Sequence, residues 1–271
     1  MPGISMWAVF RAQLHASIYW YKNNKWLAVT MFFWPYLMIL VLVGLGSIMG
    51  SFELYTERMN LSSPGFYLVS ASAIAMTSVG IIDGVAGFAL YNRWLGTLNY
   101  IILSPIRESK LFIAAGLPDS LLAALVTIVA VMPAAIYVEG LLGSLKLLII
   151  LAFMLAGMIP LTGLSVLAAS ALLVVKEESN IINSIVPFIL LVSGVFYPIT
   201  VLPRILQAVS LAVPTRYVVD AAKMISTFGT PSGAALMLLL GMLALLGIIY
   251  NTIAGVAIMR AEKAVKMRGV D

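Results

Sequence analysis

Long apolar stretches alternate with short polar connections along this chain. Six stretches are long and apolar enough, at about 20 residues each, to cross a bilayer as α-helices. They are residues 27–49, 66–90, 111–138, 145–175, 181–197 and 234–259. The fourth is long enough to tilt, and its Pro160 favours a kink. The pattern predicts an all-α membrane protein with six transmembrane helices in one transmembrane domain, residues 1–271.

Composition supports this prediction and removes several kinds of chemistry. Hydrophobic residues make up 62% of the 271 residues and charged residues only 10%, whereas soluble domains are about 25% charged. The chain has no cysteine, which excludes disulfides, thiol nucleophiles and cysteine-ligated metal centres.

The positions of Lys and Arg predict the orientation, because short cytoplasmic loops are enriched in these residues. With the N-terminus inside, eleven of the 16 lie on the inner side and five on the outer side, namely Arg58, Lys146, Arg204, Arg216 and Lys223. We therefore expect a multi-pass protein of the cell (plasma) membrane with both termini cytoplasmic. The net charge of +5 then reflects orientation and contact with the lipid bilayer, and we expect no nucleic acid partner.

Residues 1–25 lack the pattern of a cleaved signal peptide. Phe10, Leu14 and Ile18 share one helical face, with a polar stripe that includes His15 beside them. This predicts a helix lying in the cytoplasmic interface. The alternative is that the segment only lengthens the first span. We expect His15 to be interfacial rather than a ligand or a base.

Two stretches are neither spans nor simple loops. Residues 91–106 are apolar but contain Gly96 and stop at Ser104-Pro105. Thr97 is placed to cap a short helix that starts at Leu98. Its apolar side chains would be covered either by a partner protein or by the bilayer surface.

The second stretch contains Pro198, Pro203 and Pro214, too many prolines for one regular helix. Residues 204–211 and 217–226 have helical periodicity between these prolines. Irregular backbone at membrane depth survives only where protein buries it or where it lines a wet cavity. We therefore predict a re-entrant helical hairpin at 199–226 that enters the outer leaflet.

At these two stretches the chain resembles the ABC-2 family, the membrane subunits of ATP-driven exporters. The family motif Arg-x-x-Gly-Thr-Leu-x-x-Leu…Pro matches residues 93–98 followed by 103–105. The family pattern Ser-Gly-Val-Phe-(Phe/Tyr)-Pro…Leu-Pro…Pro-x-x-Tyr matches residues 193–198, 202–203 and 214–217. The interfacial helix, the six spans and the cytoplasmic termini also fit, so the likeness covers nearly the whole chain.

The resemblance implies a non-enzymatic permease that exports an amphipathic or lipid-like substrate, such as a drug, a lipid or a lipid-linked glycan. Two copies, or one copy and a related chain, would pack side by side. Each would dock a separate ABC ATPase through a coupling helix between spans two and three, at Arg93, Gly96, Thr97, Leu98, Ile101, Ile102 and Pro105. The translocation path and outer gate would include Asp83, Phe196, Tyr197, Pro198, Pro203, Pro214 and Tyr217.

The chain contains no Gly-x-x-x-x-Gly-Lys-(Ser/Thr) phosphate loop, so ATP and Mg²⁺ would bind the partner and this chain would hold no cofactor. Many relatives carry glutamates where this chain has Trp94 and Asn99. We therefore expect an apolar contact with the ATPase rather than one based on charge.

Isolated polar and small residues leave some alternatives open. Asp83 lies deep in the second span, where a carboxylate is costly. It faces the path or the seam between two copies, or it lies shallower and bonds locally. Asp119 is expected near the start of the third span, where a helix N-terminus favours an anion. Residues 176–178 form a solvated turn or touch the ATPase. Packing seams are expected at Gly157, Gly163, Ser165, Ala168, Ala169, Gly241, Gly247 and Gly255.

Two other classes of function compete with the exporter. An assembly factor or an intramembrane enzyme is one, but no metal-ligand spacing and no catalytic set of residues is found. A secondary transporter or channel is the other, which would need an inverted repeat or several intramembrane charges.

Overall fold

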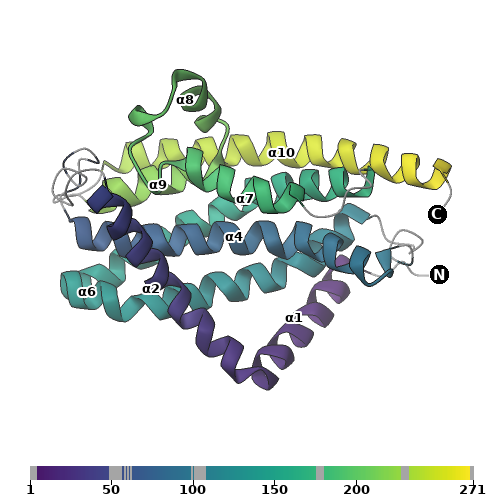
Figure 1. Cartoon of the computed structure of the whole chain (residues 1–271), viewed down its shortest axis with the longest axis horizontal. Coiled ribbons are helices and arrows are strands. Elements are labelled where there is room, and N and C mark those ends of the chain that lie inside the picture. Colours follow the sequence, from purple (N-terminus) through teal and green to yellow (C-terminus); the bar gives the residue numbers. More distant parts are fainter. Residues whose placement is uncertain are drawn as a thin grey trace.

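The computed structural model describes residues 5–48, 57, 59, 61, 63–98, 100, 108–174, 180–226 and 232–268. All regular structure in these residues is helical, which confirms the all-α prediction. The elements in Figure 1 are α1 (Met6–Asn23), α2 (Lys25–Ile48), α4 (Pro64–Trp94), α6 (Glu108–Val174), α7 (Asn180–Ser193), the 3-10 turn η1 (Ile199–Val201), α8 (Arg204–Ser210), α9 (Pro214–Ser226) and α10 (Gly233–Arg268).

Within the described residues, three helical stretches are long and apolar enough to cross a membrane: Pro64–Trp94, Lys110–Val174 and Gly233–Ala264. Shorter apolar stretches lie in α2 (Val29–Leu45) and α7 (Ser184–Ser193). The expected span at 181–197 is therefore shorter than predicted. With 14 residues, α7 is about 21 Å long, against about 30 Å for the hydrocarbon core.

The longest helix, α6, consists of two arms joined at Gly140. This glycine has φ 65° and ψ −152°, a conformation essentially restricted to glycine. A Cβ at Gly143 would overlap the carbonyl oxygen of Ala135, although residues eight apart in a straight helix are about 12 Å apart. The chain therefore reverses at Gly140, and the predicted spans 111–138 and 145–175 are the two arms.

Helix α4 lies between these arms and contacts both at the same level. On the first arm, Gly116 approaches so closely that a Cβ there would lie 2.6 Å from Val85 Cα. The Ser120 hydroxyl donates to the Gly80 carbonyl at 3.1 Å. On the second arm, Ser165 donates to the Ile82 carbonyl at 2.9 Å. Both arms therefore run alongside α4.

The helices define two ends of the bundle. At the Gly140 end, Gly65 at the start of α4 lies beside Val138. At the Trp94 end, Arg93 donates to the Leu172 carbonyl in the last turn of α6. Helix α10 also finishes at the Trp94 end (Figure 1).

Helix α10 packs on the second arm of α6 through small residues. A Cβ at Gly163 would lie 2.8 Å from the backbone nitrogen of Asn251, and the Asn251 side chain donates to the Ile159 carbonyl at 2.9 Å. The predicted seam is confirmed at Gly163 and at Gly247, which also faces Ile159. At Gly241 and Gly255 nothing in the described chain lies within 4 Å of a Cβ built there, so these two glycines line no seam within this copy.

Helix α1 is a separate element and does not extend α2. Asn24 interrupts the helix with φ −105° and ψ 60°, and α1 and α2 form a V beside the bundle (Figure 1). The Gln13 amide donates to Asp119 at 3.4 Å. Burial, and then the charge of Asp119, raise the pKa of Tyr21.

This docking differs from the expectation at two positions. Ile18 is exposed, whereas Phe10, Leu14 and Tyr21 are half-buried around Ser17, the buried residue of α1, so the inward face mixes apolar and polar side chains. Asp119 lies three turns inside α6 rather than at its N-terminus. A side-chain amide from α1 therefore stabilises it in place of a helix dipole.

Candidate functional site

The segment at 193–226, which we call the broken segment, contains the two short helices predicted from sequence. They are α8 and α9, separated by Leu211, Ala212 and Val213. The segment starts where Gly194, with φ +77°, ends α7 in the left-handed conformation typical of a helix C-terminus. A larger residue would collide there with Ile199, whose Cγ1 would lie 2.7 Å from a Cβ.

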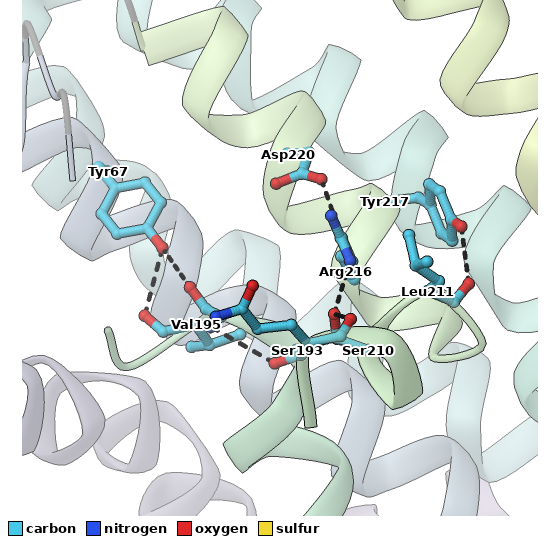
Figure 2. A network of polar contacts seen from close by, with 10 residues as sticks. Tyr67, Ser193, Val195, Ser210, Leu211, Arg216, Tyr217 and Asp220 are labelled. Carbon is cyan, nitrogen blue, oxygen red and sulfur yellow. Dashed lines mark hydrogen bonds and ion pairs between the residues drawn. The ribbon is translucent and has the colours of Figure 1, made fainter. Parts of the chain in front are cut away.

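Tyrosine hydroxyls satisfy the backbone carbonyls that these breaks expose. Tyr67 of α4 donates to the carbonyls of Gly194 and Val195 at 3.3 and 3.2 Å. Tyr217 donates to Leu211 at 2.7 Å, and both tyrosines are seen in Figure 2. Tyr250 of α10 reaches the neighbouring Ala212 carbonyl at 2.6 Å. Away from water, irregular backbone requires such protein partners.

The turn between α8 and α9 lies beside the middle of α4. Thr215 Oγ1 is 3.3 Å from Ser78 Oγ, and Ser78 stands 14 residues after Pro64 and 16 before Trp94. Tyr67, in contrast, meets the end of α7 near the start of α4. Tyr67 and Ser78 are about 16 Å apart along α4, so the broken segment passes over this distance between Gly194 and Thr215. Helix α9 then leads back toward the Gly140 end (Figure 1).

The predicted gate residues divide into buried and exposed groups. Pro198, Pro214 and Tyr217 are buried, Phe196 and Tyr197 are half-buried, and Pro203 is exposed at the start of α8. The predicted path residue Asp83 is not brought to this segment by any described contact. It lies in the Trp94 half of α4 and is exposed, and its carboxylate makes no hydrogen bond or ion pair with the described residues. The local hydrogen bond considered for it is therefore not formed within that part of the chain.

At the Trp94 end, the sequence motif forms a helix cap. Gly96 has φ +69°, its N–H donates to the Arg93 carbonyl at 3.0 Å, and the N–H of Thr97 donates to the Asn92 carbonyl at 2.9 Å. This is the hydrogen-bond pattern of a Schellman motif. The Thr97 hydroxyl donates back to Asn92 Oδ1 at 2.8 Å, and the chain is helical again at Leu98 and Tyr100, directly after Thr97.

One apolar side chain that was expected to be exposed at this end, Leu98, is not fully exposed. Leu98 is half-buried and packs with the cluster around Phe112. The outward residues are Trp94, Leu95 and Tyr100, with exposed fractions of 60%, 56% and 76%. Ile101, Ile102 and Pro105, as well as residues 176–178, lie outside the described residues, so the predicted coupling helix is described only at its first residues.

Comparison with known proteins adds no relative. No protein-family model matches this chain, and no curated protein matches it. The described residues also contain no group of three or more His, Cys, Asp or Glu side chains placed to hold a metal ion. The geometry above and the two sequence motifs are therefore the features that indicate a function.

Sequence reasoning missed several residues of this site. Tyr67 and Tyr250 lie in apolar helices, and the available signal was that a buried phenol hydroxyl needs a partner. Arg216 and Lys223 were interpreted only as orientation signals. Their spacing with Asp220, four and three residues along one helix, was the sign of a shared face.

The first prediction concerns Tyr67. Tyr67→Phe leaves two buried carbonyls without their donor, which should cost about 1–3 kcal/mol and lower the melting temperature by several degrees. Amide exchange across residues 194–202 should also become faster. Tyr137→Phe, at a side chain that is 92% exposed, is the matched control. Equal melting temperatures for the two variants would show that the hydroxyl of Tyr67 does not hold the segment.

Proposed function

We propose that this chain is the membrane subunit of an ATP-driven exporter of the ABC-2 type. The observation that carries the proposal is the level of the turn at residues 211–215, beside the middle of the long apolar helix α4. Broken helices near the bilayer midplane are the way in which many transporters build sites that open and close. The two family motifs coincide with this segment and with the Trp94 end.

The two ends of the bundle support the proposed membrane topology. Six crossings would be made by α2, α4, the two arms of α6, α7 with the residues after it, and α10. The Trp94 end would face the cytoplasm together with both termini, and the Gly140 end would face outward from the cell membrane. Helix α1, with exposed Trp7 and Trp20, suits the interface between lipid and water.

An ABC ATPase is the partner that fits the Trp94 end. Trp94, Leu95 and Tyr100, which are close in sequence, are all exposed, and large aromatic side chains dominate binding interfaces. Arg93 connects this region to the last turn of α6 by donating to the Leu172 carbonyl. Movement of a docked subunit would therefore pass directly to the second arm of α6, against which α10 and α9 pack.

Asp83 would serve a contact outside this copy of the chain. An exposed carboxylate inside a crossing helix is costly in lipid, and Asp83 has no partner among the described residues. We place it at the seam with a second copy or a related chain, or on the translocation path. An amphipathic or lipid-like substrate would move beside the broken segment, whose Tyr197, Pro198, Pro214 and Tyr217 would form the outer gate.

The docking proposal is tested by replacing the exposed patch. The double variant Trp94→Asp, Leu95→Asp should weaken binding of the ABC ATPase encoded beside this chain by about 100-fold or more, because two apolar anchors are lost and charge is buried. Co-purification and titration of the labelled ATPase measure the effect. The fold should survive, since both side chains are exposed.

Trp7→Asp, at an exposed tryptophan of α1, is the control and should retain the ATPase. Undiminished binding by the double variant would contradict this docking surface. Failure of the unmodified chain to bind any ABC ATPase would contradict the function.

A further inference from the structure

A row of charged side chains follows one face of α9. Arg216, Asp220 and Lys223 are four and three residues apart, so they share one side of the helix. All three are half-buried, whereas Val218 and Ile225 on the opposite side are buried in the bundle. Because α9 starts beside the middle of α4 and runs toward the Gly140 end, the row starts at the depth of the middle of that apolar helix, on the half-buried side of α9. Charges in such a position are costly and usually functional.

The charges in this row do not balance. Arg216 pairs with Asp220 at 3.6 Å and donates to Ser210 at the end of α8 (Figure 2). The buried Nε is the atom that faces Asp220, and at this distance it makes no hydrogen bond to that carboxylate or to any other described group. Lys223 is close enough to Asp220 and Arg216 to interact with both electrostatically. Its ammonium nevertheless donates no hydrogen bond and forms no ion pair within the described residues. The row therefore contains one carboxylate, Asp220, and two cations, Arg216 and Lys223.

The surroundings suit a molecule with one charged and one apolar part. The Arg216 guanidinium bonds Ser210, and the two residues that flank Ser210 in sequence, Val209 and Leu211, are exposed apolar side chains. Among the described residues, the other ion pair in this half of the bundle is Glu139 with Lys146 at 2.7 Å, which has equal numbers of opposite charges. The excess of positive charge is therefore a property of the α9 row.

We propose that Arg216 and Lys223 bind the anionic head group of an amphiphile, a phosphate, carboxylate or sulfonate, while Val209 and Leu211 contact its apolar part. That this amphiphile is the transported substrate rests on the proposed function; that it binds here does not. Asp220 lies between the two cations and opposes the ligand, which weakens binding and allows release. Cationic amphiphiles are disfavoured at the same row.

The purified chain alone, in phosphatidylcholine nanodiscs, provides the test. The probes are a fluorescent short-chain phosphatidic acid and a phosphocholine with the same chains. Lys223→Gln should weaken binding of the phosphatidic acid about tenfold or more, and Lys223→Arg should leave it within about threefold. Asp220→Asn should tighten it about threefold or more, because an opposing charge is removed. The phosphocholine probe should respond to none of these changes.

Lys263→Gln is the matched control, since it removes an exposed lysine of α10 and changes the net charge equally. Equal binding by the Lys223→Gln and Lys263→Gln variants would overturn the site. Weaker binding by Asp220→Asn would also overturn it, because a row needed only for structure loses function whichever charge is removed. Lys223→Gln and Asp220→Asn are expected to change binding in opposite directions, so the test remains valid even if one of the two variants folds poorly.

Inorganic phosphate decides between two sources of the same head-group chemistry. Displacement of the probe by phosphate shows that the anion alone is recognised, and resistance to phosphate shows that the apolar part is needed as well. Both results agree with an anion site at α9. Because the assay contains no ATPase, its failure leaves the proposed function standing, and loss of ATPase docking leaves this site standing.

Discussion

Gly116→Val is expected to abolish the stably folded form of this protein. A Cβ at Gly116 would lie 2.5 Å from the carbonyl oxygen of Gly84 and 2.6 Å from Val85 Cα. These are backbone atoms, so no flexible side chain can move aside. Overpacking typically costs about 1–3 kcal/mol, and here α4 and the first arm of α6 must separate, so we expect a larger loss.

The measurement is the yield and melting temperature of the detergent-solubilised protein, with size-exclusion chromatography as a check on dispersity. Gly255→Val is the matched control, because a Cβ at Gly255 has nothing of the described chain within 4 Å. It should leave all three quantities nearly unchanged. Wild-type stability in the Gly116 variant would show that the two helices do not pack as closely as described.

This close approach was only partly visible in the sequence. Hydropathy located the apolar stretches, and proline positions located α8 and α9 to within three residues. Small residues occur throughout the spans, but which of them face another helix depends on the orientation of each helix about its own axis. Gly163 and Gly247 lie in a seam, whereas Gly241 and Gly255 in the same helix as Gly247 do not.

Helix ends were less predictable than helix interiors. The expected span at 181–197 continues through Ser193-Gly194 because both neighbours are apolar, and hydropathy does not register the positive φ of a single glycine. At the other end of the bundle, the helix resumes at Leu98 after Thr97, as the N-cap chemistry of Thr97 predicted. The bond from its hydroxyl back to Asn92 was not predicted, because it depends on the Schellman turn at Gly96.

The position of the candidate site could be predicted from sequence, but the residues that hold it in place could not. The prolines marked the broken segment, while the residues that hold it in place lie more than a hundred positions earlier or on the last helix. Tyr67 is 127 and 128 residues from the carbonyls it binds. Such distant hydrogen bonds follow from the packing of α4 and α10, which a single sequence does not encode in any short pattern.

The second large effect concerns Thr215, at the turn beside the middle of α4. Its side chain is fully buried and bonded to Ser78. If ATP hydrolysis in a docked subunit opens the outer gate, this position must pass from protein interior to water. The chain has no cysteine, so Thr215→Cys introduces a single thiol whose reactivity reports that passage.

The central claim, that a separate ATPase drives this bundle, is tested most directly by the reaction of Cys at position 215 with a membrane-impermeant maleimide. The reagent is added outside sealed cells, or to outward-oriented vesicles that contain the complex with its ATPase. The account predicts slow labelling without nucleotide and labelling at least about tenfold faster in the vanadate-trapped state. Thr200→Cys, at an exposed residue, should react from outside in both states. Equal labelling of position 215 in the two states, in a complex whose position 200 reacts, would contradict the account.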